Sequence, residues 1–270
     1  MGGRPVADYV IRALEQSEVE KIYVVQEEGA NLQQVLAAGS KCTFLTKDKN
    51  DSSLAGGFLF AMEKIAQAAG SSAPQKMIMV VPCDTPLVTK DNFNVLIGKA
   101  AGKAADMIIT IIAARHLEKR FPEKHFRSVY LAEYKENYTM QNIIFIDGDF
   151  IQFKPGGEPG ERNFNFRGWD AAVMKRVLDG INSVENLRHQ PHFHDKLFLL
   201  WLLTKGYTSY IFRFMVDLAF RRLTMVRAIR YLNGADHMHS AFIESEQAEF
   251  SADIDHPQDL QGLAGIAWQA

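Results

Sequence analysis

The sequence predicts one α/β domain built on a doubly wound, mostly parallel sheet with helices on both faces. Apolar runs of strand length, clearest at Met77–Val81 and Met107–Ala113, alternate with stretches whose apolar residues recur at helical spacing. Continuous apolar runs are typical of parallel strands that helices cover on both sides. With 270 residues, 47% of them hydrophobic, the chain can form a full core and is close to the upper limit for one domain.

The elements expected in the first half follow a regular order. Amphipathic spacing predicts helices at Val6–Leu14, Gly29–Ala38, Leu54–Ile65 and Phe93–Ile97, and apolar runs predict strands at Lys21–Val25, Cys42–Thr46, Met77–Val81 and Met107–Ala113. Thr89 lies where it can cap the helix that contains Phe93. Strands that alternate with helices in this way are typical of a sheet with helical crossovers.

The pattern changes beyond residue 113. Strands are expected at Ser128–Tyr134, Asn142–Ile146 and His239–Ile243, with a hairpin turn at Asp147–Gly148, a helical elaboration over about 168–232 and a closing helix at Pro257–Trp268. No repeat or clean linker separates the two halves. We therefore expect the second half to elaborate a single domain that spans residues 1–270.

Charge and composition exclude several classes of protein. Thirty basic and 32 acidic residues give a net charge of −2, which argues against a dedicated nucleic-acid binder. The apolar stretch after Leu197 is too often interrupted by charges to span a membrane, and the N-terminus lacks a signal-peptide core. Cys42 and Cys83 both border apolar runs, so we expect buried, reduced thiols and a cytoplasmic protein.

Asp84 is the first candidate for a chemical role. It follows the predicted strand Met77–Val81, and ligands of open α/β sheets bind at the carboxyl ends of the strands. A carboxylate at this place can hold Mg²⁺ against a phosphate, because this cation takes one or two protein carboxylates and keeps several waters. Capping of a turn by Asp84 is the alternative role, and the residues alone leave both open.

A second acidic segment lies near the end of the sequence. Asp253 and Asp255 are two residues apart, so extended backbone points both carboxylates to the same side. Neighbouring carboxylates repel each other unless a cation or strong donors neutralise them. Pro257, as a first helical residue, and Asp259, in the first turn, are explained by helix initiation. Helix initiation explains Asp253 and Asp255 only in part.

Together these segments resemble a known family. Pro82–Thr89 (PCDTPLVT) and Ala252–Leu260 (ADIDHPQDL) look like motifs of nucleotidyltransferases related to molybdenum-cofactor guanylyltransferase and the sugar-phosphate uridylyl- and cytidylyltransferases. Gly2–Val10 is similar to the start of the family's first helix, and Thr139–Asn142 resembles its Gly-Gly-Asn strand. The motifs occur in the family's order along nearly the whole chain. The resemblance implies a Rossmann-like (GT-A) fold.

The resemblance also implies a reaction and a metal site. The reaction is transfer of a nucleoside monophosphate from an NTP to a small, phosphorylated or hydroxyl acceptor, with release of pyrophosphate. Asp84 is expected to coordinate Mg²⁺ at the nucleotide α-phosphate, with Asp255 as the second carboxylate and Asp253 assisting it. Such chemistry requires mainly positioning and neutralisation of charge.

The resemblance assigns further residues to substrate binding. Ser52 and Ser53 are expected near the base, at the start of the helix that begins near Leu54. Asn142 is expected on the acceptor side. Arg4 takes the place where the family usually has a lysine, which keeps the positive charge in a different geometry.

One part of the family pattern is not found in the sequence. The family begins with a strand and a glycine-rich loop whose backbone N–H groups bind the NTP phosphates, and here no apolar strand precedes Gly2-Gly3. The missing strand would lie between the strands at Ile22 and Met77. Two hypotheses follow: a nucleotidyltransferase with the loop upstream of Met1, or a catalytically impaired nucleotide-binding relative or scaffold without it. A glycosyltransferase of the same fold is a weaker alternative. Asp253-Ile254-Asp255 superficially matches the Asp-x-Asp motif of that class, but there the motif follows a mid-sheet strand, whereas here it lies near the C-terminus.

Overall fold

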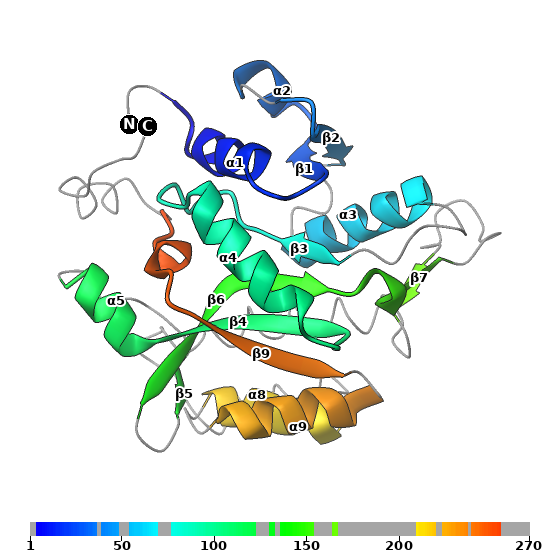
Figure 1. Ribbon diagram of the computed structural model, residues 1–270. Coiled ribbons are helices and arrows are strands. Elements are labelled where there is room, and N and C mark those ends of the chain that lie inside the picture. The colour runs from blue at the N-terminus through cyan, green and yellow to red at the C-terminus, as the bar shows by residue number, and fades with distance from the viewer. Residues whose placement is uncertain are drawn as a thin grey trace, which may run out of the picture.

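The computed structural model describes residues 4–36, 39–48, 54–69, 77–122, 130–132, 136–153, 164–166, 209–219, 223–236 and 239–254. The fold is mixed α/β (Figure 1). Its main sheet has the order β3-β6-β4-β9, and β5 pairs with β6. These strands are β3 (Ile78–Val80), β4 (Met107–Ala113), β5 (Tyr130–Ala132), β6 (Asn137–Ile146) and β9 (Ser240–Ser245).

Strand directions place the carboxyl ends of three strands at one edge of this sheet. β6 is antiparallel to both β3 and β4, whereas β9 is parallel to β4. The carboxyl ends of β3, β4 and β9 therefore lie at the same edge. They lead to α4 (Lys90–Ala101), α5 (Ala114–Arg120) and the 3₁₀ helix η2 (Ala248–Ser251), which Figure 1 shows gathered there.

A smaller parallel pair lies beside the main sheet. It consists of β1 (Ile22–Glu27) and β2 (Cys42–Lys47), accompanied by α1 (Val6–Gln16), α2 (Leu32–Val35) and α3 (Leu54–Ala69). Within the described residues β1 pairs with β2 and β3 pairs with β6, and β1 and β3 share no ladder. Apolar packing joins the two parts instead, since Val24 of β1 and Phe145 of β6 belong to one buried cluster.

The two faces of the main sheet are covered by different helices. Alternation along β6 directs Ile143 and Phe145 to the cluster formed with α1 and α4, and Met140 and Ile144 to the opposite cluster. That opposite cluster is formed with α3, α8 (Ser209–Ala219) and α9 (Met225–Asp236). Figure 1 shows α4 on one side of the sheet and the α8–α9 pair on the other. The predicted Rossmann-like arrangement with helices on both faces is confirmed.

Several local predictions are also tested. The strand Met107–Ala113 and the helix cap at Thr89 are confirmed, and β4 is almost wholly buried as expected. β3 is only half-buried, because its second edge carries no ladder in the described part of the chain. The hairpin turn at Asp147–Gly148 is wrong. The Asp147 side chain instead accepts the Asp149 N–H and starts the 3₁₀ helix η1 (Gly148–Phe150).

The predictions for the second half of the chain can be compared with the structure only in part. η1 leads into β7 (Ile151–Phe153), which pairs antiparallel with β8 (Phe164–Phe166). Within the predicted elaboration the structure describes α8 and α9. Residues 168–208 and the predicted closing helix Pro257–Trp268 lie outside the described residues. The assignment of residues 1–270 to a single domain stays a prediction.

Candidate functional site

The loop that carries Asp84 is fixed at its far end by a helix cap. Asp84 is half-buried beyond the carboxyl end of β3, and Thr85 after it is completely buried. At Thr89 a capping box begins α4: the Thr89 hydroxyl accepts the Asn92 N–H, and the Asn92 side chain accepts the Thr89 N–H at 2.8 Å. The position of Asp84 is therefore determined by a strand on one side and a capped helix on the other.

The second acidic segment lies directly against this loop. η2 ends at Ser251, and the chain continues through Asp253 to Ile254. The Ile254 N–H donates a hydrogen bond of 2.9 Å to the Asp84 carbonyl oxygen. Residues 170 positions apart in sequence are thus joined by their backbones.

Both segments also pack against the same buried apolar cluster. The buried cluster beneath them contains residues of the Asp84 loop, of β4 and α5, and of the η2 region: Leu87, Ile112, Leu117, Phe121, Ala248 and Ala252, with Ile254 packed against it. Burial of shared apolar area makes displacement of either segment unfavourable. Packing in the core, together with the hydrogen bond from Ile254, therefore fixes the relative position of Asp84 and Asp253.

An irregularity in β6 lies next to this edge. The register against β4 shifts between Ile109 and Ile111, so residues 141–143 bulge opposite Thr110. The Thr110 hydroxyl donates to the Ile143 carbonyl at 2.8 Å and replaces a lost ladder bond. Within the bulge, Gln141 is 3% exposed and its Nε2 donates to the Gln247 carbonyl oxygen at 2.8 Å, in the segment that leads to Asp253.

Two buried polar side chains were missed by the sequence reasoning. The Thr85 hydroxyl and the Gln141 Oε1 have no hydrogen-bond partner in the part of the chain that the structure describes. Most buried polar groups in proteins are hydrogen-bonded, so these two groups are exceptions that need a physical explanation. Gln141 was visible in the Thr139–Asn142 motif, just before the predicted strand Asn142–Ile146, but its partner is more than 100 residues away in sequence.

The other predicted site residues either make no contact with Asp84 among the described residues or lie outside them. Asn142 is exposed and lies on the opposite face of β6 from Gln141, and Arg4 is exposed just before α1. The contacts of the described residues bring neither of them against Asp84. Ser52, Ser53 and Asp255 lie outside the described residues, so their predicted roles stay predictions.

The two cysteines occupy different environments. Cys83, next to Asp84, is exposed, so the prediction that it is buried is wrong: β3 ends before it. Local desolvation of the sulfur by neighbouring protein atoms, and then the Asp84 carboxylate, raise the pKa of its thiol. Cys42 is half-buried, and burial together with Glu15 raises its pKa to about 12.

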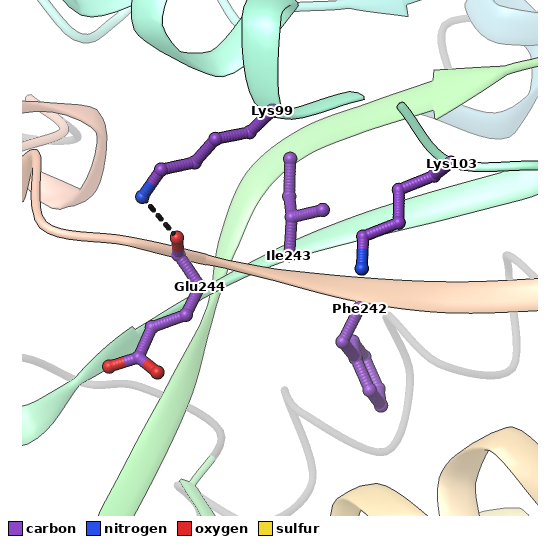
Figure 2. Close-up of a pocket in the computed structure, with 5 residues that line it drawn as sticks. All are labelled: Lys99, Lys103, Phe242, Ile243 and Glu244. Carbon is purple, nitrogen blue, oxygen red and sulfur yellow. Dashed lines mark hydrogen bonds between the residues drawn. The ribbon is translucent and has the colours of Figure 1, made fainter. Parts of the chain in front are cut away.

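A shallow hollow of about 250 Å³ lies elsewhere, at the outer edge of β9 (Figure 2). It is lined by Lys99, Lys103, Phe242, Ile243 and Glu244, and the Lys99 ammonium donates to the Glu244 carbonyl oxygen at 2.8 Å. β6 and β4 separate β9 from β3 in the sheet, so this hollow is distinct from the Asp84 loop. Among the described residues no group of three or more His, Cys, Asp or Glu side chains is placed to hold a metal.

Comparison with known proteins assigns the family. The model of the MobA-like NTP transferase domain matches residues 1–161, which is more than half of the chain. The chain belongs to the MobA-like NTP transferase family. Membership in a family of nucleotidyltransferases supports NTP-dependent transfer as the class of reaction. The matched region includes the Asp84 loop and β6.

One solved structure agrees with this assignment at the level of the fold. A hypothetical transferase from Thermus thermophilus aligns with 96% of this chain and 87% of its own, with 17% identity and a TM-score of 0.57. A 4-diphosphocytidyl-2C-methyl-D-erythritol synthase from Anaerococcus prevotii aligns with 98% of this chain and 86% of its own, with 9% identity and a TM-score of 0.47. The second TM-score is too low to support an argument.

Two further comparisons add little. A CMP:2-keto-3-deoxy-manno-octonic acid synthetase complexed with CTP covers 54% of this chain and 65% of its own, with 14% identity and a TM-score of 0.40. No curated protein is similar enough to count as a match. Within the described residues, no helix is long and apolar enough to cross a membrane.

Proposed function

We propose that this protein transfers a nucleoside monophosphate from an NTP to a small, phosphorylated acceptor and releases pyrophosphate in a Mg²⁺-dependent reaction. The observation that carries the proposal is the backbone hydrogen bond between Ile254 and Asp84. It holds the two acid-bearing segments side by side at the carboxyl edge of the sheet, where ligands of such folds bind.

The donor set at this edge suits Mg²⁺. Asp84 is a half-buried carboxylate on a fixed loop, and Asp253 is held next to it through Ile254. Carboxylate oxygens are the protein ligands that this hard cation prefers, and it needs only one or two of them. We propose Asp84 and Asp255 as the metal ligands, with Asp253 assisting them. When bound, Mg²⁺ neutralises negative charge on the phosphates.

The protein's own residues contribute mainly by position. In phosphoryl transfer the nucleotide and the acceptor must be held in line, and the developing charge must meet groups that are already oriented. We propose that Ser52 and Ser53 contact the base, that Arg4 contributes positive charge toward the phosphates, and that Asn142 faces the acceptor. The net charge of −2 supports a small-molecule acceptor rather than a nucleic acid. The free cysteines support a cytoplasmic location.

Pyrophosphate release by Asp84→Asn and Asp255→Asn tests the proposal. Each substitution keeps the size of the side chain and removes its charge, so we expect turnover to fall about hundredfold or more, which is typical for loss of one electrostatic group. Glu244→Gln is the control, because this exposed carboxylate on β9 pairs with Arg115 at 3.6 Å rather than with the Asp84 loop, and the substitution should leave turnover unchanged.

The outcomes separate the hypotheses. Full turnover in either aspartate variant would reject the metal roles. NTP binding by the wild-type chain without any pyrophosphate release would support the second hypothesis, a nucleotide-binding relative or scaffold. Hydrolysis of a nucleotide-sugar in preference to an NTP would support a glycosyltransferase.

A further inference from the structure

Gln141 connects β6 to the segment that carries Asp253. Its Nε2 donates to the Gln247 carbonyl oxygen at 2.8 Å and approaches the Ser251 hydroxyl at 3.4 Å. These acceptors lie before η2 and at its end, so one side chain contacts both ends of the 3₁₀ helix. The chain from Ser251 reaches Ile254, and hence the Asp84 carbonyl, in three residues.

The other contacts of this segment are of different kinds. The Ser245 hydroxyl accepts the Gln247 N–H at 3.0 Å, which shapes the turn but ties it only to the end of β9. Arg120 pairs with Glu249 at the surface, where such ion pairs contribute little. Phe250 is buried against Phe93, and Ala248, Ala252 and Ile254 pack in the apolar cluster shared with the Asp84 loop, but apolar packing lacks the directionality of a hydrogen bond. Gln141 supplies a directional, buried attachment to a central strand.

Gln141 is a costly residue for this place. An apolar side chain of the same length would fill the buried position, whereas the amide leaves its Oε1 without a hydrogen-bond partner in the described part of the chain. Such a group opposes stability. Removal of the amide would in turn leave the Gln247 carbonyl without this donor. The amide is therefore better explained by its hydrogen bonds to the segment 247–254 than by packing of the core.

We propose that Gln141 is a positioning residue that fixes residues 247–254 and thereby holds the segment that carries Asp253 against the Asp84 loop. This role rests on the proposed metal-dependent transfer. Gln141 itself contacts neither metal nor substrate in this proposal. It acts through the Gln247 carbonyl and the Ser251 hydroxyl, and its loss is expected to leave the fold intact while the segment opens more often.

Hydrogen–deuterium exchange of the full chain tests the attachment directly. In Gln141→Met we expect peptides that cover 247–254 to exchange about fivefold faster, the ratio that corresponds to one lost hydrogen bond. Ser251→Ala removes only the longer contact and serves as the milder variant, with a smaller increase expected.

Gln26→Met is the matched control. Gln26 lies on β1, where its side chain accepts the Leu32 N–H at 2.9 Å and donates to Thr46 at 3.1 Å, so it ties down a different loop by the same chemistry. Exchange in this variant should increase around Leu32 and stay unchanged at 247–254. Unchanged exchange of 247–254 in Gln141→Met would overturn the proposal.

The Mg²⁺ concentration for half-maximal pyrophosphate release tests whether the hydrogen bonds of Gln141 position the acidic segment for metal binding. We expect it to rise about tenfold in Gln141→Met and to stay unchanged in Gln26→Met. Faster exchange with unchanged half-saturation would show a structural role alone and would overturn the positioning role. A wild-type chain that releases no pyrophosphate would refute the proposed function instead, and the exchange experiment would still decide whether Gln141 fixes the segment.

Discussion

β9 contributes to two polar regions of the molecule that differ in a useful way. At its outer edge, the hollow of Figure 2 is lined by two lysines, a glutamate and the apolar residues Phe242 and Ile243. At its carboxyl end, the chain turns through η2 and meets the Asp84 loop. The hollow contains none of the residues of the family motifs, whereas the acidic segments at the other end carry the evidence for function.

The hydrogen bonds of the two regions differ in what they hold together. Along the outer edge of β9, the Ser240 N–H donates to the Asn233 side chain at 2.7 Å, and the Glu244 carbonyl accepts from Lys99. These contacts cover an edge strand, a common protection against pairing with other chains. Near the acidic segments, the Thr85 hydroxyl and the Gln141 Oε1 are buried without hydrogen bonds in the described part, and so is the Ser240 hydroxyl at the start of β9. The two regions therefore differ in what their hydrogen bonds do: those along β9 cover an edge strand, whereas the bond from Ile254 to Asp84 joins two distant segments.

A pair of phenylalanines gives the largest expected effect. Phe250 is 0% exposed beneath the acidic segment, with its ring 5.2 Å from that of Phe93, whereas Phe242 is only half-buried at the hollow. Phe250→Ala should lower the free energy of unfolding by about 3–5 kcal/mol, and Phe242→Ala by about 1–2 kcal/mol. Urea unfolding measures both.

Phe250→Leu covers the case in which Phe250→Ala does not fold. It should lose about 1–2 kcal/mol and should lower pyrophosphate release more than Phe242→Ala does. Equal effects of the two alanine substitutions on stability would mean that the acidic segment is no better anchored than the hollow.

The thiols report on the charge of Asp84. Cys83 is exposed and Cys42 is half-buried with a pKa near 12, so a maleimide should label Cys83 at least about tenfold faster at pH 8. Because the Asp84 carboxylate contributes to the raised pKa of Cys83, Asp84→Asn should lower that pKa and increase the thiolate fraction.

We therefore expect labelling of Cys83 to become about threefold faster in Asp84→Asn, and labelling of Cys42 to stay the same. Mass spectrometry of the labelled peptides measures both rates, which should rise with pH through and above 9. A slower reaction of Cys83 in Asp84→Asn would contradict an ionised carboxylate beside the thiol.

Periodicity was sufficient for the sheet but not for the contacts between its ends. The apolar run of β4 and the cap at Thr89 were predictable, because neighbours in sequence determine them. The exposure of Cys83 was not, because it depends on where β3 stops. The junction of Asp84 with Ile254 was not predictable either, because the hydrogen bond that makes it joins backbone groups that carry no sequence signal.

Gln141 shows the same limit more sharply. A glutamine at the border of a predicted strand gives no sign that it is buried, and only the bulge opposite Thr110 and the return of the chain after β9 give it buried partners. Such partners arise from tertiary structure. Residues that position a site can therefore be harder to predict than the charged residues of the site itself.

The smallest expected effect concerns the outer edge of β9. Lys99 and Lys103 are both exposed and both line the hollow, but only Lys99 has a hydrogen bond with the Glu244 carbonyl among the contacts of the described residues. Lys99→Met should lower the free energy of unfolding by less than about 1 kcal/mol, and both Lys99→Met and Lys103→Met should leave pyrophosphate release within about twofold of wild type. Since Lys99→Met uncovers a backbone acceptor on an edge strand, its light scattering at high protein concentration should exceed that of Lys103→Met, which loses the same charge. Equal scattering would show that charge rather than the hydrogen bond protects the edge, and a large loss of turnover in either variant would place the hollow within the functional site.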